Sequence, residues 1–309
     1  MSFFDASYDS AIQNVYCDKT RHISVDIKRE DQIHPLVSGN KFRKLKYNII
    51  QAFSEKNHTI LTYGGAFSNH IAATATAANI CGLKSIGVIR GEELKHKLEE
   101  NPNHNPTLSY AQQQDMQLHF ISRKDYKKKD DTNEIKKLQQ RFGSFYRIPE
   151  GGTNALAVKG CEEILSASDK KYDVIACCVG TGGTLAGIIN STCKHQHVYG
   201  FSALKNHNHA EIKQWVKRDN WTIFQDNNFG GYAKTNPQLI EFINSFYRCT
   251  SIKLDPIYTG KMLYQLFKMI EQNHFKNNTK ILIIHTGGLQ GIIGFNQQQS
   301  LKNKPCIEF

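Results

Sequence analysis

Residues 172–187 read YDVIACCVGTGGTLAG. The first half is an apolar run of strand length, and glycines at 180, 182 and 183 allow a tight turn into a helix near Thr184. The same order of apolar run, glycine turn and helical pattern recurs elsewhere, with further strands predicted at 59–65, 84–91, 117–122, 197–203 and 280–288. Repeated units of this kind are typical of α/β proteins, in which crossover helices connect parallel strands.

The glycine-rich turn at 179–187, VGTGGTLAG, indicates an anion site. Exposed amide groups at a helix start favour phosphate, and the hydroxyl groups of Thr181 and Thr184 add donors. The turn lacks the Lys-Ser/Thr ending of a P-loop, and Leu185 stands where the dinucleotide fingerprint has its third glycine. A compact phosphate therefore fits better than a nucleotide, and a tight turn without a ligand remains the alternative.

Composition restricts the class of protein. The chain has 309 residues, enough for two α/β domains or one large one, and a net charge of +11. That charge suits nucleic acid, an anionic ligand or a lysine-rich proteome, but basic runs interleaved with aromatics are absent, so we expect no nucleic-acid partner. The eight cysteines form no C-x-x-C pair, no apolar run reaches membrane length and no secretion signal precedes residue 17. We therefore expect a cytoplasmic protein with no membrane partner and no metal site.

A basic cluster lies at 38–50, SGNKFRKLKYNII. Ser38-Gly39-Asn40 predicts a helix start with Asn40 as N-cap, and an apolar stripe follows at Phe42, Leu45 and Ile49. Lys41 and Lys44 share another face near the first turn, where the helix dipole and neighbouring cations would lower the pKa of Lys41. Such a lysine can form an imine, and Lys44 could bind phosphate, a pairing that suits pyridoxal phosphate. A solvated basic helix is the alternative, and Arg43 and Lys46 are expected to be solvated or structural charges.

The sequence resembles the pyridoxal-phosphate enzymes of the tryptophan-synthase-β fold type, in the branch of 1-aminocyclopropane-1-carboxylate (ACC) deaminase and D-cysteine desulfhydrase. The family usually has Asp where this chain has Glu30, and the N-terminus here is short. The matching stretches appear in family order along nearly the whole chain: KRED at 28–31, SGNKFRKL at 38–45, GGAFSNH at 64–70, PEGGTNALAVKG at 149–160, VGTGGTLAG at 179–187, DPIYTGK at 255–261 and HTGG at 285–288.

The resemblance implies the fold as well as the cofactor, pyridoxal 5'-phosphate. It predicts two domains of open, twisted, mostly parallel sheets flanked by helices (fold type II). Residues 1–47 and 146–309 would form the large cofactor-binding domain and 48–145 the small one, and the protein would be a homodimer. Within the small domain, the polar stretch 92–110 contains two prolines and predicts a loop or mobile connection.

The resemblance also implies roles for individual residues. Lys41 would be the Schiff-base lysine and then the general base, and Asn69 would bond the phenolic oxygen of the cofactor. Thr286 would lie by the pyridine nitrogen. Phosphate would be held by Lys44, Gly180, Thr181, Gly182, Gly183 and Thr184. The substrate would meet Ser68, Asn69, His70, Tyr232, Tyr258 and Thr259, and Ser68, Tyr232 and Tyr258 would be catalytic together with Lys41. Each of these positions has a structural alternative, such as a helix cap or a packed aromatic ring.

Three positions bear on the reaction. ACC deaminases typically carry Glu, Leu and Gln where this chain has Thr259, Thr286 and His70, which fit the D-cysteine desulfhydrase side. The resemblance therefore implies β-elimination from a small amino acid such as D-cysteine, giving pyruvate, ammonia and sulfide. ACC deaminase, which releases 2-oxobutyrate and ammonia, is the alternative enzyme. A nucleic-acid-binding protein and a catalytically silent cofactor binder are the alternatives from other classes.

Overall fold

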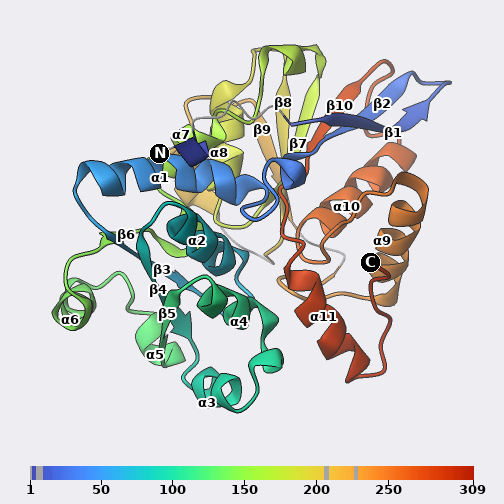
Figure 1. The fold of residues 1–309 in the computed structure, drawn as a ribbon. Helices are drawn as coiled ribbons and strands as arrows, with labels where there is room; N and C mark the ends of the chain where they lie inside the picture. The colour runs from blue at the N-terminus through green and yellow to red at the C-terminus, as the bar shows by residue number, and fades with distance from the viewer. Residues whose placement is uncertain (1, 5–9, 205–208, 226–228) are drawn as a thin grey trace.

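The computed structural model describes residues 2–4, 10–204, 209–225 and 229–309, which form two sheets (Figure 1). In these residues, the strands of the larger sheet are ordered β1 (Ile12–Asp18), β2 (Ile23–Lys28), β10 (Lys280–Ile284), β7 (Val174–Val179), β8 (His197–Ser202) and β9 (Trp221–Phe224). β1 is antiparallel to β2, and the other pairs are parallel. The smaller sheet is parallel throughout, in the order β5 (Met116–Ile121), β4 (Lys84–Arg90), β3 (Thr59–Gly64) and β6 (Tyr146–Arg147).

The larger sheet is covered by helices on both faces. Successive side chains of a strand point to opposite faces, so the fully apolar β7 contributes to two cores. Ile175 and Cys177 pack with α7 (Ala155–Cys161), α8 (Gly183–Ser191) and η6 (His209–Gln214). Val174 and Ala176 pack on the other face with α9 (Pro237–Thr250), α10 (Thr259–Glu271) and the start of α11 (Gly291–Ser300). The predicted α/β class with mostly parallel sheets is confirmed.

The smaller sheet is also covered on both faces. One face packs against α2 (Asn69–Ile80), α3 (Glu93–Glu100) and α4 (Pro106–Gln113), and the other against α5 (Arg123–Tyr126) and α6 (Thr132–Phe142). The predicted loop over 92–110 is therefore wrong. Pro102 begins η3 (Pro102–His104) and Pro106 begins α4, where the missing proline N–H leaves no hydrogen bond unmade. Buried Leu98, Leu108 and Ala111 then fix these helices on the sheet.

Helix α1 (Asn40–Ser54) lies between the two sheets (Figure 1). Its apolar stripe joins the small-domain core beside Ile60 and Ala73, and its opposite side packs on α7. The two helices touch at backbone level, because a Cβ at Gly160 would overlap the carbonyl oxygen of Arg43. The predicted boundary after residue 145 falls directly before β6, which pairs with β3 of the smaller sheet.

The remaining short elements are the 3-10 turns η1 (Ser2–Phe4), η2 (Glu30–Gln32), η4 (Glu150–Gly152) and η5 (Ala167–Lys171). Buried ion pairs fix the chain around η2: Lys28 pairs with Asp169 at 2.6 Å, and Arg43 with Glu30 at 3.0 Å. Arg43 is thus a structural charge, and Lys46 pairs with Glu163 at 2.7 Å. Among the helices of the described residues, none is long and apolar enough to cross a membrane.

Candidate active site

The start of α1 is packed against the end of β10. Gly39 adopts φ +67°, and a Cβ there would overlap the carbonyl oxygen of Thr286. That oxygen accepts a hydrogen bond from Asn40 N–H at 3.2 Å. The N-cap of α1 is therefore Gly39, and the prediction of Asn40 in that role is wrong. The glycine is required because it alone allows this backbone contact at a positive φ. The contact places Lys41 in the first turn, at the carboxyl edge of the larger sheet.

Asn40 connects Lys41 to the glycine-rich turn. Lys41 Nζ donates to Asn40 Oδ1 at 2.9 Å, and Asn40 Nδ2 donates to Thr184 Oγ1 at 2.8 Å. Burial lowers the pKa of Lys41 from its usual value. The direction agrees with the sequence argument, but the main cause is loss of hydration and not the neighbouring cations. A neutral amine is thereby favoured at a position that the turn at 180–184 holds in place.

Lys44 lies one turn further along α1 and faces two loops. Its Nζ donates to the Gly151 carbonyl at 2.8 Å, Thr153 Oγ1 at 3.0 Å and Thr181 Oγ1 at 3.3 Å. Burial, followed by the charge of Lys41, lowers the pKa of Lys44 to about 7. The Thr153 and Thr181 hydroxyl groups are themselves 2.6 Å apart. These groups form a compact polar cradle whose cation lacks an anionic partner among the described residues.

Interlocking glycines close this cradle. A Cβ at Gly182, where φ is +85°, would lie 2.5 Å from Ile212 Cγ1. A Cβ at Gly183 would lie 2.9 Å from the Thr153 side chain, and one at Gly151 would lie 2.8 Å from Thr181 Cγ2. Larger residues would fill the space between the 151–153 and 180–184 loops. The N-terminal amides of α8 are therefore free to meet a ligand, as anion-binding turns require.

The loop before α2 supplies a second set of polar groups. Ser68 is the N-cap of α2, and its Oγ accepts from Ile71 N–H at 3.3 Å. Asn69 follows, and its Oδ1 is buried without a hydrogen-bond partner among the described residues. Its amide lies against the HTGG segment, because a Cβ at Gly288 would be 2.9 Å from Asn69 Nδ2. A buried unpaired amide oxygen is unfavourable and indicates that a ligand or water completes the site.

His70 points away from this loop into the protein. It is 2% exposed, and its Nε2 lies 2.8 Å from Thr62 Oγ1. The Thr62 hydroxyl donates to the Ile148 carbonyl at 2.9 Å, so the histidine Nε2–H is the donor to Thr62. Burial holds the pKa of His70 well below its usual value. The neutral ring packs behind the 150–152 turn, where a Cβ at Gly152 would be 2.8 Å from His70 Cε1.

Two tyrosines lie beside the glycine-rich turn. A Cβ at Gly180 would be 3.3 Å from the Tyr258 hydroxyl, and the rings of Tyr258 and Tyr232 are 6.1 Å apart between centroids. Burial raises the pKa of both hydroxyl groups, although Tyr232 is 48% exposed. Asp255 fixes Tyr258, because Asp255 Oδ2 accepts from the Tyr258 N–H at 2.9 Å. Thr259 is fully buried and donates its hydroxyl to Asp255 Oδ1 at 2.7 Å.

Thr286 is buried at the end of β10, and its Oγ1 lies 3.0 Å from Cys178 Sγ on β7. The pair joins two adjacent strands of the larger sheet at the edge that Lys41 faces. The hydroxyl and the thiol can each donate or accept this hydrogen bond. Within the described part of the chain, no group of three or more His, Cys, Asp or Glu side chains could hold a metal ion.

Residues 17–287 match the family model described as "Pyridoxal-phosphate dependent enzyme". The chain belongs to this family. The mitochondrial bifunctional D-cysteine desulfhydrase/ACC deaminase of Arabidopsis thaliana is 33% identical over 86% of this chain and 72% of its own length. A Thermotoga maritima protein with a provisional assignment as an ACC deaminase is 31% identical over 87% of this chain and 90% of its own length.

Two solved structures resemble this chain over most of its length. An ACC deaminase homologue is 25% identical, with a TM-score of 0.77 over 96% of this chain and 94% of that one. A hydrogen sulfide-producing enzyme from Fusobacterium nucleatum is 14% identical, with a TM-score of 0.64 over 93% and 98% of the two chains, and it supports the fold alone. The expected fold type II is confirmed.

The residues present fit pyridoxal 5'-phosphate, the cofactor of this pyridoxal-phosphate dependent enzyme. The cradle around Lys44 is small, cationic and lined by donors, as a phosphate monoester requires. The amine of Lys41 has a lowered pKa and can react with an aldehyde. The Asn69 side chain has an unused polar atom near Gly288, in the segment that also contacts the start of α1. Aldehyde, ring substituent and phosphate therefore each have a chemically suitable neighbour.

Three residues of this enzyme's site were not predicted from the sequence. Asn40 links Lys41 to Thr184, Thr153 binds Lys44, and Asp255 holds the backbone of Tyr258. Thr153 and Asp255 lie inside stretches that match the family, PEGGTNALAVKG and DPIYTGK. A search of those stretches for hydroxyl and carboxylate groups would have found them. The predicted cluster of Lys41, Lys44 and 180–184 does come together, whereas His70 and Thr259 face protein partners.

Proposed function

We propose that this enzyme is a lyase that deaminates a small amino acid by β-elimination, with D-cysteine as substrate and pyruvate, ammonia and sulfide as products. One observation carries the choice of substrate. ACC deaminases typically carry Glu at the position of Thr259, and the Thr259 side chain here is buried and bonded to Asp255. Position 259 therefore supplies no carboxyl group that could contact the substrate. The name of the Arabidopsis relative, which includes D-cysteine desulfhydrase, supports the same choice.

The proton transfer falls to Lys41. Pyridoxal phosphate, when bound, withdraws electrons from the substrate Cα and so acidifies its proton. The lowered pKa of Lys41 leaves a neutral amine that can accept this proton. The Cα–H and Cβ–S bonds break, and sulfur leaves as a thiolate. The unsaturated amine that is released is hydrolysed by water to pyruvate and ammonia.

Other residues bind and orient. We assign the phosphate to Lys44 together with Gly180, Thr181, Gly182, Gly183 and Thr184, and the ring hydroxyl to Asn69. Thr286 is assigned to the ring nitrogen, where a neutral hydroxyl group does not enforce protonation. Ser68, at the N-terminus of α2, is assigned to the substrate carboxylate, which the helix dipole favours.

The aromatic side of the site is assigned to the substrate side chain. The raised pKa values of Tyr232 and Tyr258 keep both hydroxyl groups protonated at neutral pH, so both can donate hydrogen bonds. Thr259 supports this surface through Asp255, and His70 is held by Thr62 behind the 150–152 turn. We retain the homodimer and the cytoplasmic location as predictions, since the family resemblance and the unpatterned cysteines favour them.

The test is a direct comparison of two substrates on the purified holoenzyme. D-cysteine should release pyruvate and sulfide in equal amounts, and ACC should release little or no 2-oxobutyrate. The alternative, ACC deaminase, is supported by the deaminase assignment of the Thermotoga relative. Faster turnover of ACC than of D-cysteine would establish that alternative, and no turnover of either would refute both substrate assignments.

A further inference from the structure

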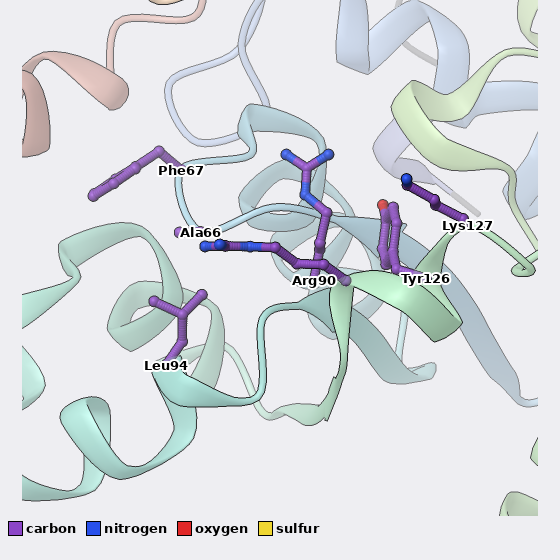
Figure 2. Close-up of a pocket in the computed structure, with 7 residues that line it drawn as sticks. Ala66, Phe67, Arg90, Leu94, Tyr126 and Lys127 are labelled. Carbon is purple, nitrogen blue, oxygen red and sulfur yellow. The ribbon is translucent and has the colours of Figure 1, made fainter.

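A pocket of about 550 Å³ lies beside the loop that leads into Ser68. We call it the Arg90 pocket, and its lining comprises Ala66, Phe67, Arg90, Leu94, Arg123, Tyr126 and Lys127. Figure 2 shows Arg90 and Tyr126 side by side, with Phe67 and Leu94 on one side and Lys127 on the other. The pocket thus combines apolar walls with cations. None of these seven residues belongs to the cofactor cradle or to the residues assigned above.

The pocket is positively charged. Arg123 pairs with Glu93 at 2.6 Å. The side chains of Arg90 and Lys127 have no ion pair or hydrogen bond among the described residues. The guanidinium of Arg90 lies over the ring of Tyr126, with its Cζ 5.5 Å from the centroid. Two cations therefore face this pocket without anionic partners in the described structure, and they favour an anionic ligand.

A buried hydroxyl group independently indicates a ligand. Tyr126 is 3% exposed, and its Oη makes no hydrogen bond of good geometry among the described residues, although the Glu150 carboxylate lies near enough to interact with it. Burial and the nearby Glu150 carboxylate raise its pKa, so the hydroxyl group keeps its proton. Glu150 itself pairs with Lys129 at 3.4 Å. A buried hydroxyl group without a well-formed hydrogen bond is unfavourable, and an acceptor oxygen entering the pocket would satisfy it.

The Arg90 pocket adjoins the proposed substrate site. A Cβ at Gly65 would lie 3.3 Å from Arg90 Nη2, and the Gly65 carbonyl accepts from Ser68 N–H at 3.2 Å. The charge of Arg90 also reaches Tyr232, where it partly opposes the effect of burial on the pKa. Arg90 ends β4, next to the carboxyl end of β3, and ligands of open parallel sheets bind at that edge.

We propose that the Arg90 pocket binds an anionic group on the side chain of the substrate. Within the proposed reaction, an amino acid whose β-substituent carries a carboxylate, sulfonate or phosphate is then preferred over D-cysteine. This proposal rests on the β-elimination proposed above. The Cα proton passes to Lys41, the Cβ–X electron pair leaves with the anionic substituent X, and water hydrolyses the remaining unsaturated amine to pyruvate and ammonia. Arg90 acts as the specificity residue and Tyr126 donates to the same group.

The test compares β-chloro-D-alanine, which is neutral at Cβ, with O-phospho-D-serine, which is anionic. Pyruvate release by the holoenzyme gives kcat/KM for each. Arg90→Gln should lower kcat/KM for the phosphate ester by about ten- to a hundredfold, the usual effect of losing a charge-assisted hydrogen bond. The kcat/KM for β-chloro-D-alanine should change by less than about twofold, because Arg90→Gln removes no contact of a neutral substituent. The matched control, Lys97→Gln, removes an exposed cation from α3 and should change neither value.

A binding measurement separates this proposal from the proposed reaction. Calorimetry on the holoenzyme compares D-aspartate with D-2-aminobutyrate, neither of which needs to react. Tighter binding of aspartate that is lost in Arg90→Gln supports the Arg90 pocket even where no substrate releases pyruvate. Equal discrimination by wild type and Arg90→Gln overturns it. So does Arg90-dependent binding of inorganic phosphate that fails to compete with aspartate, since that result identifies a separate anion site. Thermal melts establish that each variant is folded, and Arg90→Lys should restore part of the discrimination.

Discussion

Lys44 and Arg90 are both cations beside glycine-containing loops, but Lys44 is buried and Arg90 is exposed. Lys44 donates three hydrogen bonds to the 151–153 and 181 positions, whereas Arg90 contacts the ring of Tyr126. We call the surroundings of Lys41, Lys44 and 180–184 the cofactor half, and those of 65–68, Arg90, Tyr126 and Tyr232 the substrate half. The cofactor half is preformed for the cofactor, which is always the same molecule. The substrate half keeps polar atoms available for a substrate side chain, which varies.

The glycines of the two halves differ in the same way. Gly39, Gly182 and Gly183 admit no Cβ without overlap of backbone or packed side chains. At Gly65 the nearest atom to a Cβ is the flexible end of Arg90 at 3.3 Å. In a close-packed interior an added atom displaces its neighbours, whereas an exposed side chain can move aside. Substitutions in the cofactor half should therefore reduce stability and cofactor binding, and those in the substrate half should change specificity.

Replacement of Lys41 should have the largest effect. Lys41→Ala removes the amine that would bond the cofactor and accept the substrate proton, so the visible absorption band of the holoenzyme and its turnover should both disappear. Absorption spectra and pyruvate release measure the two losses. Lys41→Arg keeps the positive charge but forms no such bond, so it should behave like Lys41→Ala. A visible band that persists in either variant would place the reactive lysine elsewhere.

The sequence predicted one half of the site better than the other. Lys41, Lys44 and 180–184 are recognisable because helix starts and glycine turns are local features of the chain. The bond from Lys44 to Thr153 joins residues 109 positions apart, and no local pattern predicts such a contact. Arg90 and Tyr126 also come from different elements, β4 and α5, that meet only in the folded sheet. Their contact in the lining of the pocket was therefore not predictable.

The same distinction applies to the fold. The sequence predicted β3, β4, β7 and β10 at the centre of the two sheets, but it missed the inner strand β2, in which buried apolar residues alternate with polar ones. The edge strands β1 and β9 are partly exposed, and β6 has two residues, so their hydrophobic signal is weak. The polar segment that holds α3 and α4 was assigned to a loop because proline was taken to interrupt helices there. In the structure each proline begins one, since Asn101 and Asn105 cap the turns that follow.

The next largest effect should come from Gly39→Ala, with Gly65→Ala as its counterpart in the substrate half. At Gly39 the added Cβ meets the Thr286 carbonyl and the backbone has φ +67°, so we expect destabilisation by about 3 kcal/mol. At Gly65 the guanidinium of Arg90 can move, so Gly65→Ala should change the free energy of unfolding by less than about 1 kcal/mol. Chemical denaturation measures both. Equal losses would show that the two halves are packed alike.

A third contrast between the halves appears in the pH dependence of the apoprotein. Lys44 has a pKa of about 7 in the folded chain and near 10.5 when unfolded, so between these values the unfolded chain binds more protons. Lys44 therefore makes stability rise with pH across this window, by at most about 1.4 kcal/mol per pH unit, with no further change below about pH 7. Lys44→Met should abolish this part of the slope in denaturation experiments. Pyridoxal phosphate should also reduce it, because a bound phosphate keeps Lys44 protonated. Identical slopes for wild type and Lys44→Met would show that folding does not lower the pKa of Lys44.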